Sequence, residues 1–239
     1  MSVDIIIPAY NPGKDLVDAV KSCFNQSFKD FNIIIVDDNS DVNIKRLVWD
    51  FPDITLLKTP KNIGPAGARN FGIKNSKSEV ISFLDSDDIM HKDKLKLSLP
   101  FLSDSSEYGM VCGNYRVVVN RKTLKPPFYK RSFKIDHRML LRQNFVASGS
   151  VSLKRSVIED VGLFDESLWI AEDYDLWLRV SERYRIKYLH DVLYFYSVIP
   201  GGTSLTQRDD IQKDHNQNIL KIRERSAERM KRSKRGAHD

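Results

Sequence analysis

A chain of 239 residues with 41% hydrophobic and 29% charged side chains can bury a substantial core, and this composition excludes disorder and a membrane-embedded chain. The net charge of +6 lies almost entirely after residue 220, where eight Lys or Arg face three acidic residues. The rest of the chain is near neutral in sum, so a broad basic surface for nucleic acid is not indicated. Cys23 and Cys112 lie far apart without metal-ligand spacing, which disfavours a disulfide framework and a structural zinc site.

No stretch of the sequence approaches the roughly 20 consecutive apolar residues that span a bilayer. The first residues run directly into a strand-like segment and not into a basic and then apolar leader. We therefore expect a cytoplasmic protein.

The first hundred residues alternate short β-branched runs with segments of helical pattern. The expected strands are Val3–Ile7, Phe31–Val36, Ile54–Leu57 and Val80–Leu84, and the expected helices are Leu16–Phe24, Val42–Trp49, Ala66–Ile73 and Lys94–Leu102. This alternation predicts an α/β protein whose mostly parallel central sheet carries helices on both faces. Ligands of such sheets bind beyond the carboxyl ends of the strands.

The rhythm changes after Tyr108. There we expect strands at Met110–Val119, Phe145–Leu153 and Ile186–Val198, helices at Asp136–Arg142 and from about Ala171, and a basic helix from Ile211 to Met230 that frays over Arg232–Asp239. The interpretation is a single domain with two halves, residues 1–107 and 108–207, followed by a basic C-terminal helix or tail at 208–239.

Polar residues follow three of the expected strands. They are Pro8-Ala9-Tyr10-Asn11, Asp37-Asp38-Asn39-Ser40 and Asp85-Ser86-Asp87-Asp88. One acidic turn usually only caps a helix, but two acidic clusters at neighbouring strand ends repel each other unless a cation or donors compensate. Mg²⁺ and Mn²⁺ prefer carboxylate and phosphate oxygens. Since neither GxxxxGK[ST] nor GxGxxG follows any strand, a diphosphate held through a metal is favoured.

These motifs resemble those of the family 2 glycosyltransferases. The matching segments are Ile5–Asn11, Val36–Ser40, Asn62–Asn70, Phe83–Asp88 and Glu172–Arg179, which stand in the family's order and cover most of residues 3–180. The resemblance implies a Rossmann-like three-layer α/β/α fold of the nucleotide-diphospho-sugar transferases. It also implies transfer of a sugar from a nucleoside-diphosphate donor to an acceptor hydroxyl, with inversion at the anomeric carbon.

The resemblance assigns the donor nucleotide to Pro8, Ala9, Tyr10, Asn11, Asp38, Arg69, Asp85 and Ser86. Tyr10 would stack on the base, and Asp38 would accept the base N–H that distinguishes uracil from cytosine, which favours a UDP-sugar without excluding a dTDP-sugar. The alternative role of Asp38 is a helix cap. Asp87 would bind Mn²⁺ or Mg²⁺ directly.

By the same resemblance, Asp173 is the catalytic base that takes the proton of the acceptor hydroxyl. Acidic residues in a first helical turn are also common as complements to the helix dipole. The acceptor side is assigned to Glu172, Ser148, Gly149 and Trp169. For Ser148 and Gly149 an ordinary turn of small residues is an equally good interpretation. For Trp169 a place in the core is the safer interpretation, and a pocket wall is the alternative.

One family feature is missing. Many relatives carry a Tyr-Arg-any-His segment after the last strand, whose His contacts the metal or the diphosphate, and Ile199 stands at that position here. His190 is better explained as a surface or satisfied core residue than as a substitute ligand. We therefore expect Asp87, donor phosphates and water to hold the metal, and metal binding to be weak without donor.

The expected partners are a nucleotide-sugar donor and a glycan, glycolipid or other hydroxyl acceptor of polysaccharide or glycoconjugate biosynthesis, without nucleic acid. The alternative function is a non-catalytic nucleotide-sugar-binding protein of the same fold. The basic tail has three interpretations, namely contact with a membrane surface, packing against the body or a second subunit, and simple solvation.

Overall fold

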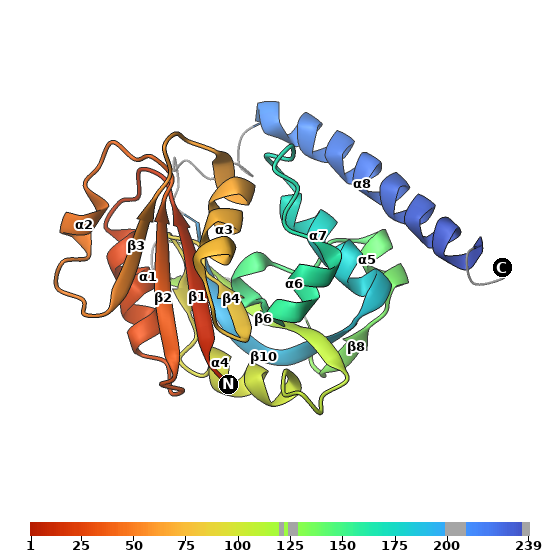
Figure 1. Cartoon of the computed structure of the whole chain (residues 1–239), viewed down its shortest axis with the longest axis horizontal. Coiled ribbons are helices and arrows are strands. Elements are labelled where there is room, and N and C mark those ends of the chain that lie inside the picture. The colour runs from red at the N-terminus through yellow and green to blue at the C-terminus, as the bar shows by residue number, and fades with distance from the viewer. Residues whose placement is uncertain (120–121, 124–128, 199–208, 236–239) are drawn as a thin grey trace.

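A computed structural model describes residues 1–119, 122–123, 129–198 and 209–235. Within these residues the strands form one ten-stranded sheet in the order β3-β2-β1-β4-β9-β6-β10-β5, with β7 beside β6 and β8 beside β10 (Figure 1). Strands from both expected halves thus share one sheet. The boundary at residue 107 stays a prediction.

The elements of the first half follow the expected alternation. The strands are β1 (Val3–Ala9), β2 (Phe31–Asp37), β3 (Ile54–Lys58), β4 (Val80–Phe83) and the short β5 (Ile89–Met90), and the helices are α1 (Asp15–Phe24), α2 (Ile44–Leu47), α3 (Gly64–Asn75) and α4 (Lys94–Ser98), followed by a 3₁₀ turn at Leu99–Phe101.

The second half is less regular. Its strands are β6 (Tyr108–Val119), β7 (Lys122–Thr123), β8 (Phe133–Ile135), β9 (Ser152–Lys154) and β10 (Arg185–Val198), and its helices are α5 (His137–Arg142), a 3₁₀ turn at Ser148–Ser150, α6 (Arg155–Val161), α7 (Glu172–Arg183) and α8 (Asp209–Arg235).

The long strands run in one direction. β1 pairs in parallel with β2 and β4, β2 with β3, and β6 with β10. β9 is antiparallel to both of its neighbours, β4 and β6, so β4 and β6 still point the same way. The expected mostly parallel α/β sheet is therefore confirmed, and the carboxyl ends of β1, β2 and β4 meet at one edge.

Alternate side chains of the strands feed two separate cores. Ile5 and Ile7 of β1 pack with α1 and α4, whereas Ile6 faces α3, α6 and α7 on the opposite side. This is the alternation that a strand buried on both faces requires. The three layers are a helical layer, the sheet and a second helical layer, as Figure 1 shows.

Several expected boundaries were wrong. The strand expected at Phe145–Leu153 is confined to Ser152–Lys154, because the small residues before it form the 3₁₀ turn. The helix expected at Lys94–Leu102 ends at Ser98, where Pro100 enters the following 3₁₀ turn. The helix expected at Val42–Trp49 is a single turn, and α8 extends beyond Met230 to Arg235.

The C-terminal helix α8 packs against the body. Ile222 and Ser226 are fully buried, and the Arg229 guanidinium donates to both carboxylate oxygens of Glu182 on α7 at 2.8–3.1 Å. Arg223 also donates to the backbone oxygen of Arg142 at the end of α5, at 2.8 Å. Among the described residues, none of the helices is long and apolar enough to cross a membrane.

Candidate functional site

The turn after β1 is fixed to the turn after β2. The backbone N–H of Asn11 donates to Ser40 Oγ at 2.9 Å, and the Asn11 side-chain oxygen accepts from the backbone N–H of Asp41 at 2.8 Å. Asn11 takes a left-handed backbone conformation with φ of 44°, which Asn tolerates better than most residues. Pro8 and Ala9 form the end of β1, and the Tyr10 side chain beyond them is 54% exposed. A ring held this way is accessible for stacking.

Asp38 is buried at the end of β2 and its carboxylate is already engaged by protein donors. It accepts from Thr59 Oγ1 at 2.9 Å, from the Gly64 N–H at 2.9 Å, and from the Ile63 N–H at 2.9 and 3.2 Å. The Ile63 and Gly64 N–H groups stand at the start of α3, where helical N–H groups lack intrahelical partners. Asp38 therefore caps α3, and its role in reading the base stays a prediction.

Trp169 lies over the start of the same helix. Its side chain is 56% exposed, and a Cβ placed on Gly64 would come within 3.3 Å of the indole ring. Gly64 also has φ of +77°, a conformation that favours glycine. Trp169 is thus an exposed aromatic wall on the Gly64 backbone, and the interpretation as a core residue is wrong.

The buried guanidinium of Arg69 joins the two acidic motifs. Arg69 lies on α3 and donates to Asp85 at 2.7 Å and to Glu172 at 2.6 Å. Burial alone would lower the pKa of Arg69, but Asp85 and then Glu172 more than offset this and raise it. The sequence assigned Arg69 to the donor. In the structure it connects the turn after β4 to the first turn of α7.

The acidic turn after β4 holds three carboxylates with different surroundings. Asp85 faces Arg69, whereas Asp88 is buried and accepts from the Ser197 N–H at 2.8 Å. Burial and then repulsion by Asp85 raise the pKa of Asp87 to about 6, and burial followed by Asp85 and Asp87 raises the pKa of Asp88. Ser86 lies between them and is half-buried.

Asp87 is the member of this turn that suits a cation. It is half-buried, and Asp85 repels its charged form. Among the described residues no group of three His, Cys, Asp or Glu side chains is arranged to hold a metal ion. Asp87 fits a divalent ion only if phosphate oxygens and water complete the coordination, which is common for Mg²⁺.

Asp173 stands at the start of α7 beside the acceptor-side turn. One of its oxygens accepts from Ser148 Oγ at 3.0 Å and the other from the Tyr174 N–H at 2.6 Å. Burial raises the pKa of Asp173, while the Arg69 charge opposes this shift. The preceding Ala171 has φ of 65°, which is strained for a residue with a Cβ and is typical of functional sites.

Glu172 is buried and accepts a hydrogen bond from Arg69, whereas its neighbour Asp173 accepts one from Ser148. Burial raises the pKa of Glu172 to about 7; the Arg69 charge opposes this shift, and repulsion by Asp173 adds to it. Glu172 thus serves as a link between α7 and Arg69. Its assignment to the acceptor remains a prediction.

Lys94 is a functional candidate that the sequence interpretation missed. It is fully buried, and its ammonium donates to the backbone oxygens of Phe83 at 2.9 Å and Gly149 at 2.8 Å. It therefore connects the end of β4 to the turn that carries Ser148. The signal in the sequence was helical spacing, since Lys94 shares a buried face of its helix with Leu95, Ser98 and Leu99.

The two remaining candidates do not join the site. His190 lies on β10 with a side chain that is 54% exposed, and it contacts Ser132 and Asp191. The interpretation as a surface residue is confirmed. Ile199, at the position of the missing family His, lies outside the described residues.

The sequence and the fold of this chain both resemble those of known proteins. Residues 4–162 match the family model described as Glycosyl transferase family 2. The chain belongs to this family. An uncharacterized glycosyltransferase of Rickettsia typhi is 28% identical over 218 residues, which are 88% of this chain and 68% of that protein. The UDP-Glc:alpha-D-GlcNAc-diphosphoundecaprenol beta-1,3-glucosyltransferase WfgD of Escherichia coli is 29% identical over 180 residues, covering 74% of this chain and 69% of WfgD.

Solved structures agree on the fold of this family 2 glycosyltransferase. TarS of S. aureus superposes with a TM-score of 0.72 at 24% identity, covering 83% of this chain and 37% of TarS. Its residues 1–349 in complex with UDP give a TM-score of 0.72 at 22% identity over 95% of this chain and 65% of that one. The chain spans 68% of the first two curated relatives, 32% or less of three longer ones, and 37% of the longer TarS chain.

The buried Lys94 generates a prediction for stability against pH. Burial lowers the pKa of Lys94 to about 7 from an ordinary 10.5. Between these values the unfolded chain binds a proton that the folded chain does not, so the free energy of unfolding rises with pH by up to about 1.4 kcal/mol per unit. Below pH 7 both states are protonated and this contribution is constant.

Urea denaturation of the wild type and Lys94→Met at pH 7, 8 and 9 measures this difference. The wild type should gain stability relative to Lys94→Met as the pH rises, whereas Lys74→Met, which removes an exposed lysine, should follow the wild type. Parallel curves for the wild type and Lys94→Met would show that the ammonium stays charged in its buried position. If Lys94→Met does not fold, Lys94→Gln takes its place.

Proposed function

We propose that this family 2 glycosyltransferase transfers a sugar from a UDP-sugar to an acceptor hydroxyl with inversion, and that Asp173 is the base. The observation that carries the proposal is the position of Asp173. It is partly exposed, its pKa is raised by burial, and Ser148 orients it beside the Arg69-bound turn of Asp85–Asp88. A carboxylate with a raised pKa accepts a proton more readily near neutral pH.

The donor class follows from relatives and from the accessible turn after β1. The name of WfgD gives UDP-Glc as its donor, and TarS 1–349 was solved with UDP and with UDP-GlcNAc. Tyr10 offers an exposed ring for the base. We propose that Pro8–Asn11, Asp38 and Ser86 line the nucleotide, and that Asp85 reaches the ribose or the water shell of the metal.

The reaction needs a base for the proton of the acceptor hydroxyl and a positive charge beside the leaving diphosphate. As the acceptor oxygen bonds to the anomeric carbon, the bond between that carbon and the diphosphate oxygen breaks and the electron pair leaves with the nucleotide. Asp173 takes the proton that the acceptor oxygen releases. Ser148 holds the carboxylate in place during this transfer, because its hydroxyl donates to the oxygen opposite the one that Tyr174 N–H contacts.

The proposed cofactor is Mn²⁺ or Mg²⁺ held by Asp87. Mannosyltransferase PcManGT from Pyrobaculum calidifontis, with a TM-score of 0.64 at 20% identity, was solved with GDP-Man and Mn²⁺. A bound divalent ion would offset the charge that develops on the leaving diphosphate. Burial and repulsion by Asp85 disfavour the charged form of Asp87, and a divalent ion bound to Asp87 would stabilise that form.

The proposed acceptor is the hydroxyl of a glycan or glycolipid in polysaccharide or glycoconjugate biosynthesis. The name of WfgD gives a diphosphoundecaprenol-linked sugar as its acceptor. Trp169 supports a sugar acceptor, because its exposed indole on Gly64 can pack against the apolar face of a sugar ring. Glu172 and Gly149, the other residues assigned to the acceptor side together with Ser148, are buried.

Nucleotide release from a panel of UDP-, dTDP-, CDP- and GDP-sugars tests the transferase and its base. With Mn²⁺, the wild type should release nucleotide from the UDP-sugars, and removal of the metal should abolish this. Asp173→Asn should lower release by at least about 100-fold, since general base catalysis contributes about 10²–10⁴-fold. Asp87→Ala should lower release toward the level seen without metal, since it removes the proposed metal ligand. Asp191→Asn, a change distant from the site, should not alter it.

Calorimetric titration of UDP with each variant separates chemistry from binding. Asp173→Asn should bind UDP and Mn²⁺ as the wild type does, whereas Asp87→Ala should lose the dependence of UDP binding on the metal. Donor binding without turnover in the presence of every acceptor tried would favour the non-catalytic binder, and no binding of any nucleotide would overturn the proposal.

Asp38→Asn tests the proposed reading of the base separately from its role as a cap. The amide offers one acceptor oxygen where the carboxylate offers two, so we expect a lower melting temperature through the weakened start of α3. If Asp38 accepts the imide N–H of uracil, UDP binding should fall at least about tenfold more than CDP binding, as expected for loss of a charge-assisted hydrogen bond. Equal weakening of both nucleotides would leave Asp38 a cap alone.

A further inference from the structure

Two segments of the chain carry its positive charge, and only one of them is the tail. Residues 116–142 contain nine Lys or Arg and a single acidic residue, Asp136, a net charge of +8. Residues 221–239 contain eight Lys or Arg against three acidic residues, a net charge of +5. Since the whole chain carries +6, all other residues together carry −7. The near-neutral body therefore conceals a strongly basic segment.

The fold brings the described parts of these two segments together. Arg223 of α8 donates to the backbone oxygen of Arg142 at 2.8 Å, and Ser226 of α8 lies 3.5 Å from the His137 ring of α5. The same His137 bonds to Ser181 of α7 at 2.7 Å. In Figure 1, β8, α5 and the C-terminal half of α8 lie on the same side of the molecule, away from α1 and α2.

The basic side chains of this side face solvent. We define the basic face by its exposed members Lys130, Arg131, Lys134, Arg138, Arg142, Lys231 and Arg232. Within the part of the chain that the structure describes, none of the seven forms an ion pair with a carboxylate, whereas the nearby Arg183, Arg225 and Arg229 are paired with Asp160, Asp165 and Glu182. The positive charge of the basic face is thus left for a partner.

We propose that the basic face docks this protein on the surface of an anionic lipid bilayer. Clustered Lys and Arg bind anionic head groups, and each basic side chain near such a surface strengthens binding by about fivefold. Leu220 supports a bilayer over a nucleic acid: it is 60% exposed on α8, one turn before Glu224 and about three turns before Lys231, and can enter the head-group region. The proposal does not rest on the transferase activity.

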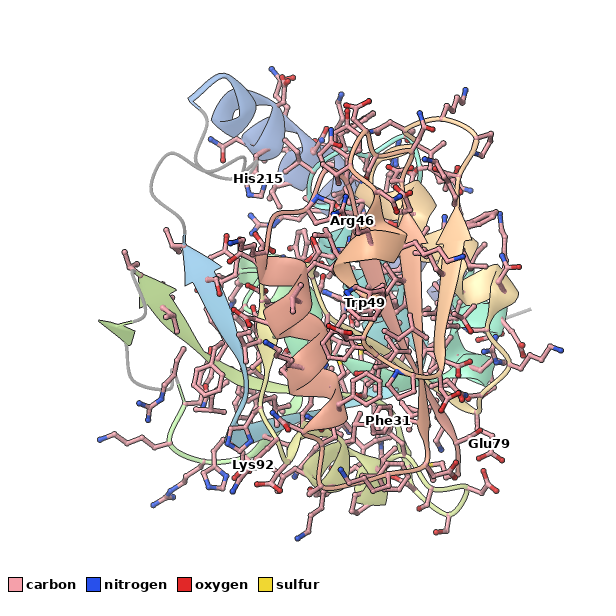
Figure 2. The ribbon with its side chains drawn as sticks, turned by 90° about the vertical axis from the view of Figure 1, so that its left-hand side faces the viewer. Phe31, Arg46, Trp49, Glu79, Lys92 and His215 are labelled. Atoms are coloured by element: carbon pink, nitrogen blue, oxygen red, sulfur yellow. The ribbon has the colours of Figure 1, made fainter. Side chains whose placement is uncertain are left out.

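Two charge-matched variants of the full chain test the basic face. The first changes Arg131, Lys134, Arg138 and Arg142 to Gln. The second changes Lys14, Lys21, Lys45 and Arg46 to Gln; these residues are also exposed but belong to the α1 and α2 side, where Figure 2 labels Arg46. Both variants have the same net charge, so a difference between them reports the location of the charge. Circular dichroism and melting temperature confirm that both are folded.

Co-sedimentation with vesicles gives the measurement. The wild type and the α1–α2 variant should pellet with vesicles that contain phosphatidylglycerol and not with pure phosphatidylcholine, and 0.5 M salt should release them, since screening is strong at that ionic strength. The basic-face variant should bind the anionic vesicles at least about tenfold more weakly. Equal binding of the two variants, or no binding by the wild type, would overturn the proposal. Binding of the wild type to duplex DNA but not to vesicles would also overturn it and assign the face to nucleic acid.

Discussion

The site depends on one buried cation. Arg69 reaches from α3 to the turn after β4 and to the first turn of α7, and it contacts Asp85 and Glu172 at 2.7 and 2.6 Å. These segments are far apart in the chain: Arg69 and Glu172 belong to the helices α3 and α7, and Asp85 follows the strand β4. A buried ion pair of this kind contributes little net stability by itself, but the loss of one partner leaves an uncompensated buried charge that costs about 3–5 kcal/mol. Its main effect is to fix the geometry between the proposed metal turn and the proposed base.

Arg69 does not neutralise its surroundings. The turn after β4 and the first turn of α7 are rich in carboxylates, and burial and mutual repulsion raise the pKa values of Asp87, Asp88, Glu172 and Asp173. Raised pKa values mean that the charged forms lack sufficient compensation. A divalent ion beside Asp87 would remove part of this repulsion, and the diphosphate that it brings would in turn be neutralised. We therefore expect cooperative binding: the donor binds more tightly when the metal is present, and the metal binds more tightly when the donor is present.

The residues that follow the strands could be predicted from the sequence, because the direction of parallel strands alone decides where their ends lie. Parallel strands place their carboxyl ends at one edge, so Tyr10, Asp38 and Asp87 were brought to one region by topology alone. The sequence offered a helix cap as the alternative role of Asp38, but it did not predict that the capped helix is α3 or that Lys94 joins Phe83 to Gly149, since both contacts bridge segments that the chain order does not relate. The strand expected from Phe145 failed for a similar reason. The apolar residues there are buried by tertiary packing, while Ser148–Ser150 form a turn that Lys94 and Tyr194 hold in place.

Most polar side chains of the site already have protein partners before any ligand arrives. Asp38 is occupied by the start of α3, Asp85 and Glu172 by Arg69, and Ser148 by Asp173. These side chains already lose their conformational entropy when the protein folds, so ligand binding does not carry the cost of fixing them. The two large exposed side chains of the site, Tyr10 and Trp169, are aromatic and lose few rotamers on contact. A preorganised transferase site needs fixed charged groups, because these groups must not reorganise as the leaving group develops its charge. The aromatic side chains can stay exposed, since they carry no such charge.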